Sequence, residues 1–169
     1  LLITAEVMRA FGVDVTVGER DIYIKGNSHY VPREYTVEGD CSGAAFFEAM
    51  NRLGSDIKIT GLNPESVQGD RVYGKYFDKL CEGFATLDIT DCPDLAPVLM
   101  ALGAAKSGVT LTGTARLRAK ESDRGAAMAE ELSKFGIKTE LHENTLTVHG
   151  GQLKAPSVPI CSHKDHRIV

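Results

Sequence analysis

Residues 129–150 read AEELSKFGIKTELHENTLTVHG, and residues 5–26 show the same pattern as AEVMRAFGVDVTVGERDIYIKG. The two copies align without a gap and share Ala5/Ala129, Glu6/Glu130, Phe11/Phe135, Gly12/Gly136, Glu19/Glu143 and Gly26/Gly150. Apolar residues at helical spacing precede a glycine, which is favoured where a helix ends in left-handed backbone. Alternating apolar residues then flank a short polar turn. Each copy therefore predicts a helix followed by a β-hairpin.

A second repeat aligns SDIKITG (55–61) with SGVTLTG (107–113). An apolar run typical of a helix precedes each copy, at 44–54 and 95–108. A stretch typical of a strand precedes each of these runs, at 35–40 and 85–90. The later copy then continues into the hairpin of 129–150. We therefore predict an α/β (α+β) fold of stacked supersecondary units with sheets packed against helices. The earlier copy is expected to lack its hairpin.

Composition limits the possible functions. The 169 residues are 43% hydrophobic and 25% charged, which is ordinary for a globular protein, and the net charge of −4 argues against nucleic-acid binding. No apolar run is long enough to span a bilayer, and no signal-peptide pattern is present. The four cysteines lack CxxC spacing, which favours reduced thiols in the cytoplasm. Because the chain starts at Leu1 inside a helical pattern and stops after HKDHRIV, it is expected to be a piece of a longer one.

The stretch RLRAKESDR, residues 116–124, combines basic residues with a helix start. Ser122 or Asp123 is suited to cap that helix. Arg124 in the first turn, with Lys120 before it, opposes the helix dipole. Such a run is either a solvated basic loop or an anion site, because basic side chains here adjoin free backbone N–H groups. Glu121 within it can tune the lysine pKa or carry a proton.

Two carboxylates stand at other helix starts. Asp94, in DCPDLAPVLMAL (91–102), is either a helix cap or a carboxylate that accepts a proton from a substrate hydroxyl. Asp40, in VEGDCSGAAFF (37–47), is expected to cap the helix that follows it. Capping is the ordinary reading for both residues.

The last motif is SHKDHR, residues 162–167. His163 and His166 flank Asp165, which is a spacing that suggests a metal site. Lys164 and Arg167 would repel a cation, so we predict no metal here. An arginine that contacts an anion beside a histidine fits this motif better.

These motifs together resemble the 3-phosphoshikimate 1-carboxyvinyltransferase (EPSP synthase) family. RLRAKESDR is similar to the KE[ST]DR motif of that family, DHR (165–167) to a second motif, CPDLAP (92–97) to its PDxAP segment, and VEGDCSGAAFF to its VEGDxSSAxxF segment. The resemblance implies a two-lobed enzyme of repeated βαβαββ units, in which each lobe is an inside-out α/β barrel. Residues 1–36 would be the end of the N-terminal lobe, and residues 37–169 most of an incomplete C-terminal lobe.

The family's reaction transfers the enolpyruvyl group of phosphoenolpyruvate to the 5-hydroxyl of shikimate 3-phosphate and releases phosphate. It uses neither a metal nor an organic cofactor. The resemblance further implies a monomeric cytoplasmic enzyme of aromatic amino acid biosynthesis, with small-molecule substrates and no nucleic-acid or membrane partner.

The resemblance also assigns roles by position. Asp94 would hold the shikimate 3-phosphate hydroxyls and act as base, and Lys120 would lie between the two substrates. Glu121 would shuttle a proton to or from the methylene carbon of phosphoenolpyruvate. Arg124 and Arg167 would clamp the phosphoenolpyruvate carboxylate, where a planar fork suits a planar anion.

His166, beside this clamp, and Asp40, as a cleft carboxylate, are further candidates. Arg116 departs from the family pattern, in which some members have asparagine. The family's N-terminal Lys-Ser phosphate-binding stretch, its Ser-Ser-Gln segment and its final lysine have no match here, so the chain alone is predicted to be inactive or nearly so. The alternatives are the sibling enolpyruvyl transferase for UDP-N-acetylglucosamine and a non-catalytic binding or assembly module of the same fold.

Overall fold

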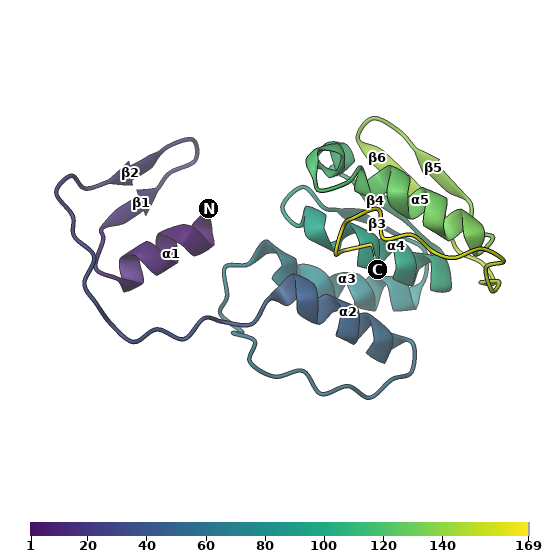
Figure 1. The fold of residues 1–169 in the computed structure, drawn as a ribbon, viewed down its shortest axis with the longest axis horizontal. Coiled ribbons are helices and arrows are strands. Elements are labelled where there is room, and N and C mark those ends of the chain that lie inside the picture. The colour runs from purple at the N-terminus through teal and green to yellow at the C-terminus, as the bar shows by residue number, and fades with distance from the viewer. Residues whose placement is uncertain (169) are drawn as a thin grey trace. The chain divides into compact units, whose positions relative to one another are not determined.

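The computed structural model describes residues 1–168, which divide into two compact units (Figure 1). The first unit comprises Leu1–Gly39 and Gly61–Gln68, and the second comprises Asp40–Thr60 and the chain from Gly69 onward. The assignment of residues 1–36 and 37–169 to two lobes of a larger enzyme stays a prediction. No helix among the described residues is both long and apolar enough to cross a membrane.

The first unit contains helix α1 (Leu2–Ala10) and an antiparallel hairpin of β1 (Val15–Val17) and β2 (Ile22–Ile24). Its small core consists of Ala5, Val13 and Val15. Gly12, with φ 87°, takes the left-handed conformation predicted for the residue after the helix. The predicted helix and hairpin are therefore confirmed in this copy.

The helices of the second unit are α2 (Cys41–Arg52), α3 (Tyr73–Glu82), α4 (Ala96–Ala105) and α5 (Arg124–Lys134). Short 3-10 helices lie ahead of the last three: η1 (Gly69–Val72), η2 (Pro93–Leu95) and η3 (Thr114–Ala119). Its strands are β3 (Ala85–Asp88), β4 (Gly108–Thr112), β5 (Thr139–Leu141) and β6 (Thr145–His149). The strand, helix, strand, helix and hairpin predicted for the later repeat are all present.

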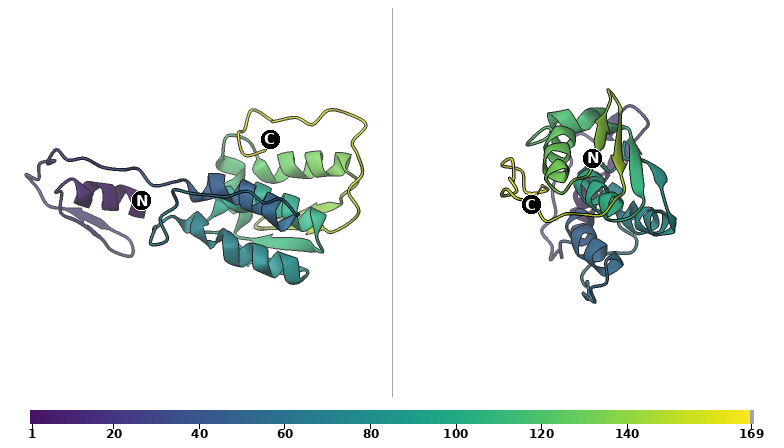
Figure 2. Two further views of the ribbon diagram at one scale, coloured as in Figure 1. Left: turned by 90° about the horizontal axis from the view of Figure 1, so that it is seen from below. Right: turned by 90° about the vertical axis from the view of Figure 1, so that its right-hand side faces the viewer.

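The four strands form one sheet in the order β3-β4-β6-β5. The pair β3 and β4 is parallel, and the other two pairs are antiparallel. Buried residues alternate along the strands and point to one face, which α4 and α5 cover (Figures 1 and 2): Leu87, Val109, Leu111, Leu146 and Val148. Helix α4 is buried on nearly all sides, as expected for a helix that is apolar all round.

The predicted strands at 35–40 and 55–61 are wrong, because neither stretch is a strand in the structure. One backbone hydrogen bond, from Gly39 N to Gly61 O at 2.9 Å, joins the ends of the two stretches. Strands depend on neighbours for their hydrogen bonds, and two parallel strands without a third are unstable. Instead, the side chain of Asn51 satisfies the Ile57 backbone: Oδ1 accepts from the amide at 2.7 Å and Nδ2 donates to the carbonyl at 2.9 Å.

The missing hairpin explains why these two predicted strands do not form. Helix α3 ends at Glu82 and β3 begins at Ala85, so only Gly83 and Phe84 separate them. In the later repeat, the hairpin strand β6 pairs directly with β4. The earlier repeat has no such strand to pair with 55–61, as the sequence predicted.

Candidate active site

The candidate site is organised around Arg124, the first residue of α5. Asp123 caps this helix, because its Oδ1 accepts a hydrogen bond from the Ala126 amide at 3.1 Å. The capping prediction for Ser122 or Asp123 is thus confirmed for Asp123. The cap fixes the start of the helix and therefore the direction in which the Arg124 side chain leaves it.

The Arg124 guanidinium is buried, with its side chain 2% exposed, and it contacts carboxylates from three parts of the sequence. Nε donates to Asp165 Oδ2 at 2.8 Å, Nη1 to Asp94 Oδ1 at 2.6 Å, and Nη2 to Glu121 Oε2 at 2.7 Å. A buried charge requires such partners. The reading of RLRAKESDR as a solvated basic loop therefore fails for Arg124.

Asp165 is the innermost of these carboxylates, with a side chain that is 0% exposed. It also accepts hydrogen bonds from Ser122 Oγ at 2.9 Å and from the Arg167 amide at 3.0 Å. Burial alone would raise its pKa, but the hydrogen bonds from Arg124, Arg167 and Ser122 and the arginine charge lower it to about 2. Asp165 is therefore ionised at neutral pH and orients Arg124.

Asp94 lies in η2, and Oδ1 contacts Lys120 Nζ at 2.9 Å in addition to Arg124. Its side chain does not cap η2, so the capping alternative is not observed. Burial would raise the pKa of Asp94, but Lys120 and Arg124 outweigh it and lower the pKa. The structure thus joins the predicted pair Asp94 and Lys120 directly.

Arg167 and Asp40 form the opposite end of the cluster. Arg167 Nη2 lies 3.4 Å from Asp40 Oδ2, although the two residues are 127 positions apart. Asp40 also caps α2 as predicted, because it accepts from the Ser42 amide at 3.1 Å and the Gly43 amide at 2.9 Å. Arg167 Nε is buried and has no hydrogen-bond partner among the described residues.

His166 and Arg116 lie at the margin of the Arg124 cluster. The His166 side chain is 65% exposed, and its Nδ1 is 3.9 Å from Asp165 Oδ1. Arg116 is exposed and donates only a long hydrogen bond, 3.4 Å, to the Thr90 carbonyl. Among the described residues, neither side chain forms a hydrogen bond or ion pair with Arg124.

The sequence reading missed Asp70, in η1. A Cβ added to Gly69 would collide with the Asp91 carbonyl oxygen, so this glycine lets η1 approach the turn before η2. Asp70 is thereby brought into the electrostatic range of Asp94. Burial and then the Asp94 charge raise the pKa of Asp70 to about 6. In the sequence Asp70 is one acidic residue ahead of a helix, and only the close approach at Gly69 distinguishes it.

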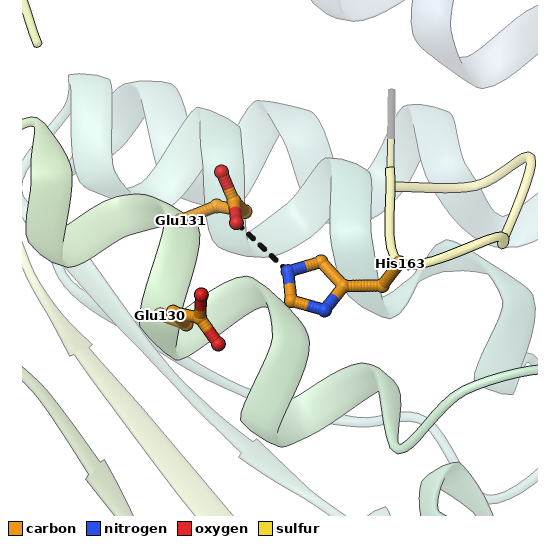
Figure 3. A group of neighbouring side chains, drawn as sticks. All are labelled: Glu130, Glu131 and His163. Atoms are coloured by element: carbon orange, nitrogen blue, oxygen red, sulfur yellow. Dashed lines mark hydrogen bonds and ion pairs between the residues drawn. The ribbon is translucent and has the colours of Figure 1, made fainter. Parts of the chain in front are cut away.

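The histidine spacing in SHKDHR, which suggested a metal site, does not bring His163, Asp165 and His166 into one ligand group among the described residues. His163 turns to α5, where its Nε2 lies 2.8 Å from Glu131 Oε1 (Figure 3). Asp165 instead contacts Arg124. Glu130, Glu131 and His163 each offer a ligand atom within 4.8 Å of the others. Lys134 Nζ already contacts both Glu131 oxygens, at 2.8 and 2.9 Å. The Glu131 carboxylate is thus already paired with an ammonium group.

Comparisons with known proteins agree with the motifs. The family model for EPSP synthase (3-phosphoshikimate 1-carboxyvinyltransferase) matches residues 2–81 and 76–169. The two matches overlap in α3, next to the missing hairpin. A 3-phosphoshikimate 1-carboxyvinyltransferase of Clostridium kluyveri is 37% identical over 185 residues, covering 98% of this chain and 43% of the relative. One from Halobacterium salinarum is 33% identical over 192 residues, covering 99% and 44%.

A solved structure of EPSP synthase from Acinetobacter baumannii superposes with a TM-score of 0.59 and 25% identity, covering 98% of this chain and 45% of that one. The chain therefore spans less than half the length of these relatives. The expected enolpyruvyl transferase fold, in incomplete form, is confirmed. Because the family model matches nearly the whole length in two segments, the chain belongs to the EPSP synthase family.

Proposed function

We propose that this chain supplies part of the site that transfers the enolpyruvyl group of phosphoenolpyruvate to the 5-hydroxyl of shikimate 3-phosphate. The observation that carries the proposal is the Arg124 cluster, which joins Asp94, Glu121 and Asp165 from three separate motifs in one network. A scaffold alone has no need for a buried arginine that also faces partly exposed carboxylates. The names of the relatives support the same reaction.

The exposure of the three carboxylates suggests how Arg124 accepts a substrate. Asp165 is fully enclosed, whereas the side chains of Asp94 and Glu121 are 33% and 50% exposed. An arriving carboxylate or phosphate can displace the two exposed groups, while Asp165 keeps the guanidinium in place. A planar guanidinium binds a carboxylate through two parallel hydrogen bonds, which suits phosphoenolpyruvate. Arg167, with an unpartnered buried Nε, supplies the second arm of the clamp.

The proton chemistry follows from the same exchange. As the substrate hydroxyl oxygen attacks phosphoenolpyruvate, it loses a proton, and the methylene carbon gains one to give a tetrahedral intermediate. Asp94 accepts the hydroxyl proton, and Glu121 carries a proton to the methylene carbon. When phosphate leaves, the methyl group returns a proton to Glu121, and the departing phosphate takes the proton held by Asp94. A carboxylate with a lowered pKa is a weak base, so Asp94 becomes effective when Lys120 and Arg124 turn to the substrates.

The remaining features of the proposal come from the family. The reaction would take place in the cytoplasm, in a monomeric parent enzyme, with neither metal nor organic cofactor and with no nucleic acid or membrane involved. His166 and Asp40 would line the margin of the site. Because catalysis between two substrates depends on positioning groups from both sides of a cleft, the 169-residue chain by itself should show little or no turnover.

Calorimetry of the 169-residue chain with shikimate 3-phosphate and phosphoenolpyruvate tests the proposal. Lys120→Met should weaken binding of shikimate 3-phosphate by about tenfold or more, the loss of one charge-assisted hydrogen bond. Lys138→Met is the matched control, because Lys138 is exposed and, within the part of the chain that the structure describes, forms an ion pair only with Glu140. Equal affinity of the two variants would refute the role of Lys120. Rapid turnover by the chain alone would refute the expected inactivity.

A further inference from the structure

The segment after β6, residues 151–168, contains no helix or strand, yet it carries Asp165 and Arg167 into the anion cluster. Secondary structure therefore does not set its path. Backbone hydrogen bonds fix its start, from Gly151 N to Ala104 O at 3.2 Å and from Lys154 N to Phe135 O at 3.0 Å. The later residues need side-chain anchors as well, because each ordered residue of such a segment costs about 1 to 2 kcal/mol of backbone entropy. Two anchors are present, one at Asp165 and one farther back on α5.

The second anchor is Glu131, whose side chain is 8% exposed. It accepts a hydrogen bond from the Cys161 amide at 2.9 Å and one from His163 Nε2 at 2.8 Å (Figure 3). Lys134 contacts both carboxylate oxygens and donates to the Pro159 carbonyl at 3.3 Å. Burial would raise the pKa of Glu131, but these donors lower it to about 2. Glu131, paired with Lys134, thus holds residues 159–163 on α5.

The two anchors enclose a turn with an uncommon backbone. His163 and Lys164 have φ angles of 51° and 58°, in the left-handed region that residues other than glycine rarely adopt. Such a conformation persists only where contacts on both sides hold it. Here His163 is held by Glu131, and Asp165, two residues later, is held by Arg124 and Ser122. The turn transmits the position of one anchor to the other.

We propose that Glu131 is a positioning residue: by holding residues 159–163 on α5, it sets Asp165 and Arg167 in the anion cluster. The effect on the local structure stands on the contacts alone. The effect on substrate binding rests on the function proposed above. Lys134 completes this clamp, because its ammonium group ties Glu131 to the Pro159 carbonyl.

Glu131→Gln tests the clamp in the 169-residue chain, and Glu130→Gln is the matched control. Glu130 is the neighbouring residue with the same charge, but it is exposed and lies 4.0 Å from Lys134. In Glu131→Gln, hydrogen exchange at the Cys161 and Arg167 amides should accelerate about tenfold, while exchange in β4 and β6 stays as in the control. The affinity for phosphoenolpyruvate should fall about tenfold with it, and Glu130→Gln should change neither.

Glu131→Asp separates geometry from charge, because it keeps the carboxylate but is too short to reach all its partners. It should behave like Glu131→Gln. Unchanged exchange at Cys161 and Arg167 in Glu131→Gln would overturn the proposal, as would a uniform increase through β4 and β6. Should the substitutions at Glu131 prevent folding, His163→Leu removes one contact from the segment side. It is expected to accelerate hydrogen exchange at the Arg167 amide, while exchange at the Cys161 amide and in β4 and β6 stays unchanged. If the unaltered chain binds no phosphoenolpyruvate, the proposed function fails, while the exchange comparison still decides the clamp.

Discussion

Asp165→Asn should destabilise the second unit more than any comparable change at its surface. The substitution keeps the side-chain shape and removes the charge that accepts hydrogen bonds from Ser122, Arg124 and the Arg167 amide. Removing one partner of a buried ion pair costs about 3 to 5 kcal/mol. Arg124 keeps two other carboxylates, so we expect the lower end, about 3 kcal/mol. Ser122→Ala, which deletes one of the same hydrogen bonds, should cost about 1 kcal/mol.

Urea unfolding followed by circular dichroism measures both losses. The pH adds a second test, because Asp165 has its pKa lowered to about 2 from the ordinary 3.8. A lowered carboxyl pKa stabilises the folded state above pH 4, and this stabilisation disappears as pH falls from about 4 to 2. Asp165→Asn should abolish that part of the acid dependence. A loss below 1 kcal/mol at neutral pH, or one no larger than that of Ser122→Ala, would refute the view of Asp165 as a buried counter-ion.

Asp70 has a pKa raised to about 6, so its ionisation opposes folding, and the free energy of unfolding should fall as pH rises from about 4 to 6. Asp70→Asn should therefore be about 1 to 2 kcal/mol more stable than the unaltered chain at pH 7, after allowance for solvent screening, and equal to it at pH 4; urea unfolding at the two pH values checks this. Binding of phosphoenolpyruvate should raise the pKa of Asp94, because Lys120 and Arg124 turn to the ligand. A carboxyl-carbon NMR titration with and without ligand measures this pKa, and an unchanged value would contradict the prediction. Gly69→Ala should destabilise the second unit by about 1 to 3 kcal/mol, because the new methyl group meets the Asp91 carbonyl oxygen in the turn before η2; unfolding indistinguishable from the unaltered chain would show that η1 can move away.

The local elements were predictable because their signals lie within a few residues. Asp123 and Asp40 cap the helices that follow them, and the glycine after each repeated helix takes left-handed backbone. Stretches 35–40 and 55–61 have the same strand pattern as β3 and β4, yet they form no strand. A sequence pattern shows that a segment is suited to form a strand. A strand also needs a neighbouring strand to pair with, and the earlier repeat lacks one because its hairpin is missing.

The candidate site was predictable as a set of residue types but not as a set of contacts. Composition around Arg124 indicated a basic helix start and left open whether solvent or an anion faced it. The deciding group is Asp165, 41 positions away along the chain. Its route to Arg124 depends on Glu131 and a left-handed turn, neither of which has a sequence signal at this distance. Buried ion pairs between distant residues are therefore visible only in the folded chain.

The local charge balance determines how this site can bind anions. Lys120 and Arg124 are not free cations, because Asp94 contacts both, and Arg124 also contacts Glu121 and Asp165. The site therefore does not attract anions by an excess of positive charge, in keeping with the net charge of −4. Under the function proposed above, it would bind them by exchange: the partly exposed carboxylates would release the cations to the substrate. The same proposal makes substrate binding and activation of the base one electrostatic event, because the released Asp94 would recover basicity when a substrate hydroxyl is present.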